Sequence, residues 1–371
     1  MTTQHPTESV AAVPLPTPGN PQPPAARLQG LILQSGWKVI EKLKVPPGAT
    51  GGQFSCPYVV EREGRRAFLK ALDYSKADEI AKQLGIDIPT ALQSLVAAYN
   101  FERNLLQDCA QKRMDRVVVA LEDGSVKVED GVFGTVNYLI FEPADGDVRK
   151  HLSLAAQIEV RWILRCLHHV ATGLNQLHSA KVAHQDLKPS NVLVFDRKLS
   201  KVADLGCASV KGTVCPRDNV IFAGDGTYAP PELLYGHQDP EWGRRRKACD
   251  VYHLGSLAVF FFCGVGITAL ILKNMPQEHL YEEWAGNYAQ ILPEVRDAFG
   301  LALQEFQQNV PGANLSNALR EAVSQLCDPD PALRGHPLNR VGISDQYSLE
   351  RYVGLFNTLA LKAEIGILER A

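Results

Sequence analysis

Three polar side chains on one short stretch indicate the chemistry that this sequence is equipped for. Asp186, Lys188 and Asn191 stand at positions i, i+2 and i+5. A carboxylate can orient a hydroxyl nucleophile and accept its proton, an ammonium group can neutralise a moving phosphoryl group, and an amide oxygen can bind Mg2+. The spacing of these residues therefore predicts phosphoryl transfer.

The apolar pattern on both sides of this stretch predicts the elements that position it. Upstream, apolar residues recur with i, i+3, i+4 spacing as far as His178, which indicates a helix: residues 160, 163, 164, 167, 170, 171, 174 and 177. Downstream, two short strands are expected at 192–195 and 200–203, on either side of the turn 196–198. The loop is thus expected between a helix and a hairpin.

The first part of the chain predicts a mostly antiparallel sheet with inserted helix, and the part after Asp145 is mostly helical. Residues 73–112 predict helix. Strands are expected where apolar residues alternate or cluster, with a hairpin turn at 63–65 and a second, Gly- and acid-containing hairpin before the last strand: 37–44, 58–62, 66–72, 116–121 and 137–141. The fold class is therefore expected to be α+β.

Residues 254–272 form a nearly uninterrupted apolar run of 19 residues, which is long enough to cross a bilayer. The same composition is expected of a helix that is buried on all sides at the centre of a lobe. The family resemblance carried by the motifs given below implies that the segment 328–334 folds back onto the same lobe, so we favour the buried helix over a membrane span.

Bulk composition indicates one two-lobed globular unit with extensions, at 371 residues, 45% hydrophobic and 21% charged. The net charge of -3 gives no basic field for nucleic acid. The eight cysteines lack zinc-site spacing and no signal-peptide pattern is present, so we expect reduced thiols and a cytoplasmic location. Seven prolines in residues 1–26 predict a disordered tail, with docking of a partner on this Pro-rich segment as the alternative.

Several ordered motifs resemble those of eukaryotic-type protein kinases over roughly residues 37–340. The segment His184-Gln-Asp-Leu-Lys-Pro-Ser-Asn191 resembles the catalytic loop, Asp204-Leu-Gly206 resembles the D-F-G motif, and Pro230-Pro-Glu232 resembles A-P-E. The lysine two residues after the loop aspartate resembles the Ser/Thr-directed form.

The resemblance implies a bilobal kinase-like fold and a protein Ser/Thr kinase activity that uses ATP and Mg2+, with the protein substrate left open. It implies a Pro-rich tail at 1–28, an N-lobe at 29–143 with a helical insertion at about 76–98, and a C-lobe at 144–371. A pseudokinase that binds nucleotide or acts as a scaffold is the alternative. Small-molecule kinases share the fold, but they lack the Asp-Leu-Lys-Pro-x-Asn loop.

The resemblance also assigns the nucleotide site. Lys70 in Ala67-Phe-Leu-Lys70 is expected to bind the α/β-phosphates, with Glu102 as its carboxylate partner and Glu79 as the competitor. Asp186 and Lys188 are the expected catalytic residues. The remaining expected contacts are Asn191 and Asp204 to Mg2+; Gly48, Gly51 and Gly52 to the phosphates, although G-x-G-x-x-G is not present as such; Glu142 and Ala144 to adenine; and Asp147 to ribose.

Two further contacts are implied for the larger lobe. Asp250 is expected to brace the backbone of the catalytic loop, and Arg334 is expected to form an ion pair with Glu232. Thr227 is expected near the acceptor hydroxyl.

Gln185 departs from the family pattern, because kinases carry at this place an arginine that binds a phosphorylated residue of the activation segment. Glutamine is uncharged and cannot form that pair strongly. We therefore predict activity without phosphorylation of the candidate sites Ser209, Thr213 and Thr227.

Overall fold

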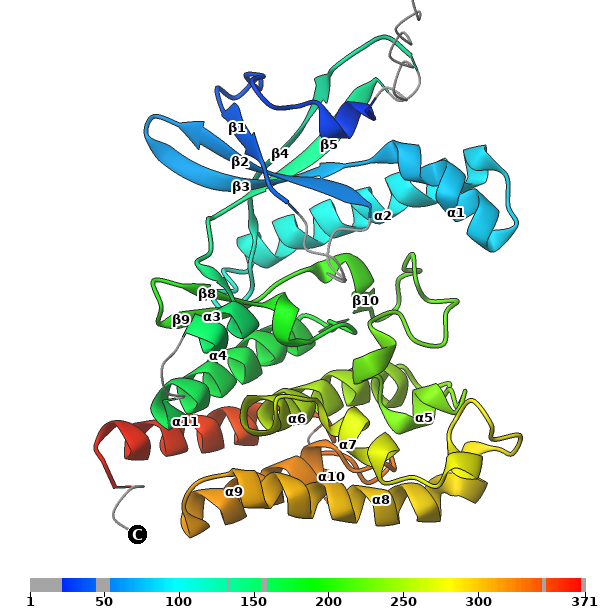
Figure 1. Cartoon of the computed structure of the whole chain (residues 1–371), viewed down its shortest axis with the longest axis vertical. Coiled ribbons are helices and arrows are strands. Elements are labelled where there is room, and N and C mark those ends of the chain that lie inside the picture. The colour runs from blue at the N-terminus through cyan, green and yellow to red at the C-terminus, as the bar shows by residue number, and fades with distance from the viewer. Residues whose placement is uncertain (1–21, 45–53, 132–133, 155–158, 342–344, 368–371) are drawn as a thin grey trace, which may run out of the picture.

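The computed structural model describes residues 22–44, 54–131, 134–154, 159–341 and 345–367. Its smaller N-lobe is built on a sheet and its larger C-lobe is mainly helical (Figure 1). The predicted α+β bilobal fold is confirmed. The three glycines expected to cradle phosphate, Gly48, Gly51 and Gly52, lie outside the described residues.

The N-lobe sheet has five antiparallel strands in the order β1-β2-β3-β5-β4. Its strands are β1 (Lys38–Lys42), β2 (Ser55–Arg62), β3 (Arg65–Leu72), β4 (Ala120–Lys127) and β5 (Thr135–Phe141). The predicted hairpin joins β2 to β3 through a two-residue turn. Glu63 and Gly64 both have positive φ, 52° and 75°, as a tight turn between twisted strands requires.

Two helices accompany this sheet, α1 (Ala77–Leu84) and α2 (Ile88–Gln111). Gly85, with φ 65°, ends α1, and the Asp87 side chain accepts a hydrogen bond from Thr90 N (2.7 Å) at the start of α2. Figure 1 shows α2 beneath the sheet, with its first turns and α1 extending past the sheet edge. These turns occupy the residues of the expected helical insertion and form a small apolar cluster of their own around Ala91 and Leu95.

The predicted strand at 116–121 is wrong. Residues 116–119 cross to the C-lobe, where Val118 N donates to Val202 O (2.8 Å) and Val202 N donates to Arg116 O (2.9 Å). The strand β4 begins only at Ala120. Val117 is buried in a cluster that joins α2 to the C-lobe, and Val118 is buried in a cluster with C-lobe residues. Their apolar character therefore reflects packing where the two lobes meet rather than a strand of the sheet.

The boundary expected for the N-terminal tail is also wrong at its C-terminal end. Residues 24–26 form a 3-10 turn, and Ala25 and Leu28 are buried in the N-lobe core. The Tyr58 hydroxyl donates to Ala25 O (2.7 Å). The ordered lobe therefore starts before residue 28, because two apolar side chains at the end of the Pro-rich stretch cover the sheet.

The C-lobe surrounds two central helices, α4 (Val160–Ser179) and α6 (Ala248–Cys263) (Figure 1). The two expected strands of the catalytic hairpin are β8 (Val192–Phe195) and β9 (Leu199–Val202), which pair with each other, and β8 also pairs with β6 (Gly146–Asp147). The other elements are α3 (Val148–Leu154), β7 (Val182–Ala183), β10 (Ser209–Val210), α5 (Pro231–Leu234), α7 (Ile267–Lys273), α8 (Tyr288–Asn309), α9 (Ala313–Leu326), α10 (Pro337–Arg340) and α11 (Glu350–Glu364).

The apolar run at 254–272 forms two helices rather than one. Nearly every residue of α6 is buried, and Gly264, with φ 74°, ends it before α7 begins. In the part of the chain that the structure describes, no single helix is long and apolar enough to span a membrane. The segments Gly243–Cys263 and Ile267–Lys273 pass that test only as a pair, bent by 76°, and only by length and composition.

Candidate active site

Lys70 on β3 and Glu102 on α2 meet beneath the N-lobe sheet. Lys70 Nζ donates to Glu102 Oε1 (2.9 Å) and Oε2 (3.1 Å), and lies 3.5 Å from Asp204 Oδ1. The expected pairing with Glu102 is therefore confirmed. The competitor Glu79 pairs instead with Lys76 (2.7 Å) on the surface of the helical insertion.

Lys70 and Asp204 hold each other in the ionised state, whereas burial raises the pKa of Glu102. Burial alone would lower the pKa of Lys70, but Asp204 and Glu102 outweigh that effect and raise its pKa. The Lys70 ammonium in turn lowers the pKa of Asp204, although burial opposes this. A protonated lysine beside an ionised aspartate suits a site for phosphate and a divalent cation.

Packing between the lobes places Asp204 beside Glu102. Leu205, which follows Asp204 in the chain, is fully buried in one cluster with Leu105 and Leu106 of α2. Asp204 itself has φ 66°, an unusual value for a residue other than glycine, and the surrounding contacts must hold it there. Leucine therefore does the packing work expected of phenylalanine in a D-F-G motif.

The catalytic-loop residues Asp186, Lys188 and Asn191 converge as expected. Lys188 Nζ lies 3.1 Å from Asp186 Oδ2, and Asn191 Nδ2 donates to Asp186 O (2.7 Å) and Oδ2 (3.1 Å). His184 joins the loop to the residue before Asp204, because its Nε2 donates to Ala203 O (2.9 Å) while its Nδ1 accepts from Asp186 N (3.2 Å). Two segments of the site are thus fixed to each other.

Asp186 faces a cavity of about 160 Å³ that is also lined by Lys70, Glu102, Asp204 and Arg217. Burial raises the pKa of Asp186, and the neighbouring Lys188 ammonium offsets only part of that rise. A carboxylate of raised pKa is a better proton acceptor than an ordinary aspartate at neutral pH.

Asp225 is a site residue that the sequence did not reveal. Its backbone N donates to Asp186 Oδ1 (2.9 Å), its Oδ2 lies 3.5 Å from Lys188 Nζ, and its Oδ1 accepts from Thr227 N (3.1 Å) and Oγ1 (2.8 Å). Thr227 is thus tied to Asp186 through Asp225. The available signal was an aspartate between two glycines, Gly224 and Gly226, just before the Pro230-Pro-Glu232 motif.

Asp250, at the start of α6, braces the loop backbone as expected. Its Oδ2 accepts from His184 N (2.7 Å) and His178 Nε2 (2.9 Å), and its Oδ1 accepts from Gln185 N (2.8 Å). Burial alone would raise the pKa of Asp250, but the His178 contact and the further hydrogen bonds outweigh burial and lower it. The brace is therefore an ionised carboxylate.

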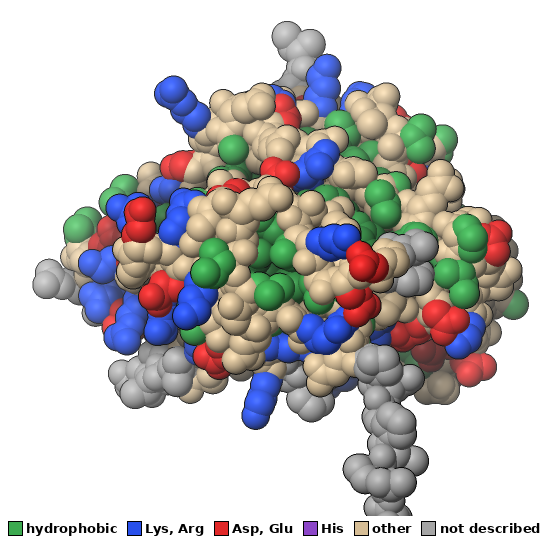
Figure 2. Space-filling view, turned by 90° about the horizontal axis from the view of Figure 1, so that it is seen from above, with side chains coloured by type: hydrophobic (Ala, Val, Ile, Leu, Met, Phe, Trp, Pro, Cys, Tyr) green, Lys and Arg blue, Asp and Glu red, His purple; other side chains and the backbone are tan. Residues whose placement is uncertain are grey.

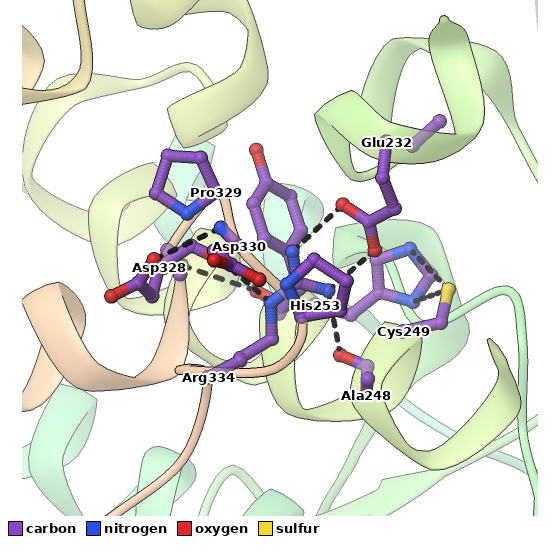
Figure 3. A network of polar contacts seen from close by, with 12 residues as sticks. Glu232, Ala248, Cys249, His253, Asp328, Pro329, Asp330 and Arg334 are labelled. Atoms are coloured by element: carbon purple, nitrogen blue, oxygen red, sulfur yellow. Dashed lines mark hydrogen bonds and ion pairs between the residues drawn. The ribbon is translucent and has the colours of Figure 1, made fainter. Parts of the chain in front are cut away.

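The expected Arg334–Glu232 ion pair is present and doubly bonded (Figure 3). Arg334 is 0% exposed, and its remaining donors reach backbone oxygens, with Nε to Asp328 O (2.9 Å) and Nη1 to Ala248 O (3.2 Å). The pair joins α5 to the turn before α10, and α5 stands at the end of the activation segment, which runs from the D-F-G-like motif at Asp204 to the A-P-E-like motif at Glu232.

The side chains of Asp204 and Asn191 fit the expected Mg2+ ion. Asn191 uses its amide nitrogen on Asp186, and its Oδ1, which accepts only a long contact from Ser190 Oγ (3.5 Å) among the described residues, can serve as an oxygen ligand; Asp204 is held ionised by Lys70. Mg2+ takes a few protein oxygens and completes its shell with phosphate and water. This pair of oxygen donors therefore suits Mg2+ bound with a nucleotide.

The expected hinge residues Glu142, Ala144 and Asp147 follow β5 and lead into α3. The Glu142 carboxylate pairs with Lys201 on β9, which anchors the start of the connection. Ala144 packs beside Val118 between the lobes. Asp147 caps α3, with its Oδ1 accepting from Arg149 N (2.8 Å). Contact of these residues with adenine and ribose stays a prediction.

Residues 89–339, more than half of the chain, match the model of the protein kinase domain. Together with the lobes and the site, this match shows that the chain belongs to the protein kinase family. The match begins at residue 89, after Lys70. The assignment of Lys70 as the phosphate-binding lysine therefore rests on its contact with Glu102 and not on the match.

The chain is also similar to parts of curated kinases. It is 29% identical over 135 residues to the probable serine/threonine-protein kinase pknA2 of Bifidobacterium longum (36% of this chain, 17% of that protein). It is 32% identical over 124 residues to the serine/threonine-protein kinase SBK1 of Danio rerio (32% and 30%). It is 24% identical over 239 residues to the serine/threonine-protein kinase par-4 of Caenorhabditis briggsae (60% of this chain, 32% of that protein). The chain thus spans less than a third of each relative.

Proposed function

We propose that this chain is a protein kinase that transfers the γ-phosphoryl group of ATP to a Ser or Thr hydroxyl of another protein. The observation that carries the proposal is the cluster of Lys70, Glu102, Asp204 and Asp186 on one cavity, with Lys70 Nζ 2.9 Å from Glu102 and 3.5 Å from Asp204. These are the groups needed to hold nucleotide phosphates opposite a hydroxyl nucleophile.

The proposed chemistry is positioning and neutralisation of charge. Asp186 orients the acceptor hydroxyl and takes its proton, while Lys188, 3.1 Å from that carboxylate, lies where it can neutralise the moving phosphoryl group. Lys70 holds the phosphates that stay with the nucleotide. Mg2+, when bound, neutralises further phosphate charge, and Asp204 and Asn191 would hold it.

The Ser/Thr acceptor is supported by the lysine two residues after Asp186 and by the printed names of the relatives. Peptide mixtures that carry Ser, Thr or Tyr as the only acceptor would test it. Incorporation of phosphate into Ser or Thr peptides is expected. Transfer to Tyr peptides alone would contradict the proposed acceptor.

Independence from activation-segment phosphorylation is part of the proposal. It is supported by Gln185, which is uncharged and whose side-chain amide is bound inside the protein rather than directed to a surface site. Phosphatase treatment is expected to leave the turnover rate unchanged. Loss of activity on dephosphorylation, with recovery in Thr213→Glu, would contradict it.

The decisive experiment compares ATP turnover with Mg2+ in the unaltered chain and in Asp186→Asn. We expect turnover to fall by roughly a hundredfold or more when the proton acceptor is lost. The matched control is Asp196→Asn, because Asp196 is an exposed aspartate in the turn between β8 and β9. Equal phosphate transfer by the unaltered chain and Asp186→Asn would contradict the kinase function, and nucleotide binding without transfer would indicate a pseudokinase.

A further inference from the structure

Gln185 binds an arginine from another part of the chain. Its side chain is 0% exposed, its Nε2 donates to Arg246 O (2.7 Å), and its Oε1 accepts from Arg246 Nη1 (3.2 Å). Gln185 also has φ 69°, which a buried residue of this size keeps only when its surroundings fix it. Both ends of the amide therefore bind Arg246, and Nε2 also lies 3.5 Å from Asp250 Oδ1.

Arg246 lies in the π-helical turn Gly243–Lys247 that leads into α6. Its neighbour Arg244 is exposed, whereas the Arg246 side chain is 4% exposed. Widened turns of this kind change the direction of the following side chains and often occur at functional positions. Here the widened turn accompanies a guanidinium group that points inward, behind the catalytic loop.

The other terminal nitrogen of the Arg246 guanidinium, Nη2, contacts the activation segment. Its Nη2 lies 3.2 Å from Asp218 Oδ1 and donates to Asp218 O (3.2 Å). The Asp218 carboxylate also accepts from Cys215 N (2.7 Å) and from Ser209 Oγ (3.3 Å). Arg245 Nη2 donates to Asp218 O as well (3.0 Å). The middle of the activation segment is thus bound to the turn before α6 through Asp218.

We infer that Arg246 is a positioning residue that supplies, from the turn before α6, the cation that Gln185 lacks, with Asp218 as its built-in anionic partner. The Asp218 carboxylate supplies the negative charge that a phosphorylated residue of the activation segment would otherwise supply. Hydrogen bonds between such charged groups are stronger than those between neutral groups. Because Asp218 is part of the sequence, this contact needs no added phosphate.

The fastened segment returns directly to the reacting centre. Gly224 fits so closely that a Cβ atom there would lie 2.6 Å from Gln185 O and 2.7 Å from Asp186 Oδ1. The next residue, Asp225, donates its N–H to Asp186 Oδ1 (2.9 Å). Loss of the Arg246–Asp218 contact would therefore loosen the segment that orients Asp186. The effect on catalysis rests on the proposed function, whereas the effect on segment order does not.

Two single substitutions test the inference. Asp218→Asn keeps the shape and an acceptor for Cys215 N but removes the charge, and Arg246→Gln removes the guanidinium. Both are expected to lose amide-exchange protection across residues 209–225, and to lower kcat by about tenfold or more while KM for ATP stays within about twofold. The matched control is Arg244→Gln, the exposed arginine of the same turn, which should behave like the unaltered chain in both measurements.

The double variant separates a shared contact from two independent defects. If Arg246 and Asp218 act through each other, Asp218→Asn together with Arg246→Gln should be no worse than Arg246→Gln alone. Additive losses, or normal exchange protection in Asp218→Asn, would overturn the inference. Asp218 is 31% exposed, so its substitution should leave the core folded even where Arg246→Gln does not. If the unaltered chain transfers no phosphate, the proposed function fails, and the exchange pattern still decides this inference.

Discussion

Arg334 and Glu232 form a two-fold ion pair inside the C-lobe, with Nη1 2.7 Å from Oε1 and Nη2 2.8 Å from Oε2. The guanidinium carbon also lies 5.0 Å from the centre of the Tyr252 ring. These residues are far apart in the sequence, so the pair fixes the end of the activation segment against the helical core. Figure 3 shows how the arginine is surrounded by acceptors.

Breaking this pair on one side should destabilise the fold strongly. Glu232→Ala would leave the buried guanidinium without its counter-charge, at a cost of roughly 3–5 kcal/mol in the free energy of unfolding. Urea unfolding followed by circular dichroism measures that loss. The control is Arg296→Ala, which removes an exposed pair with Asp330 (3.0 Å) and should cost at most about 1 kcal/mol. Similar losses in the two variants would mean that burial of the Arg334 pair is unimportant.

The contact between Lys70 and Glu102 predicts which glutamate supports activity. Glu102→Gln should lower kcat/KM for ATP by roughly a hundredfold, because Lys70 loses the charge that keeps it aligned with the phosphates. Glu79→Gln is the matched control, since among the described residues Glu79 pairs with the partly exposed Lys76 (2.7 Å), and it should stay within about twofold. A larger loss in Glu79→Gln than in Glu102→Gln would reverse the assignment.

The order of motifs in the sequence was sufficient to predict the bilobal fold and most of the site. Lys70, Glu102, Asp186, Asn191 and Asp204 each follow a recognisable local pattern, and the fold brings them together. Glu102 is 32 residues from Lys70, and the intervening α1 and first turns of α2 explain that spacing. Local pattern was enough here because each residue lies within or directly beside a short motif whose order along the chain is recognisable.

The remaining site residues depend on contacts that no local pattern carries. Three consecutive arginines occupy 244–246, and only the packing of the widened turn decides that Arg246 points inward. Its partner Asp218 is 28 residues away in an irregular segment. The strand predicted at 116–121 failed for a related reason, because Val117 and Val118 are buried where the two lobes meet.

Charge on the face above the N-lobe gives little guidance to function. Figure 2 shows basic and acidic side chains interspersed on the face seen from above the N-lobe, in keeping with a net charge of -3. The charges that indicate function are instead those inside the molecule, such as Lys70, Asp250 and Arg334, which the fold brings into contact with specific partners.

The raised pKa of Asp186 predicts an acid limb in the activity profile. Asp186 must be ionised to accept the hydroxyl proton, so kcat/KM should rise with pH through its pKa and then level off. Because burial raises that pKa, the limb should lie above the usual value for aspartate, about 3.9. A pH profile with circular dichroism at each pH, to exclude unfolding, measures it. A midpoint at or below the usual value would contradict the effect of burial.

The pKa of Asp250 is shifted in the opposite direction to that of Asp186, and we expect the effect in the free energy of unfolding rather than in the rate. Its pKa is lowered in the folded state, so the ionised carboxylate contributes stability above its unfolded pKa, about 3.9, and loses that contribution as pH falls through its folded pKa. At neutral pH, Asp250→Asn should cost roughly 1.5–3 kcal/mol, because the bonds from His178, His184 and Gln185 lose their charged acceptor.

The test is urea unfolding of the unaltered chain and Asp250→Asn at neutral pH and at a series of acidic values. The difference in the free energy of unfolding should be largest at neutral pH and shrink as the pH falls below about 4. Asp196→Asn, which alters an exposed aspartate, serves as control and should show no such convergence. A difference that stays constant with pH would mean that Asp250 braces the loop by shape alone. Convergence would identify its charge as the source of the stability.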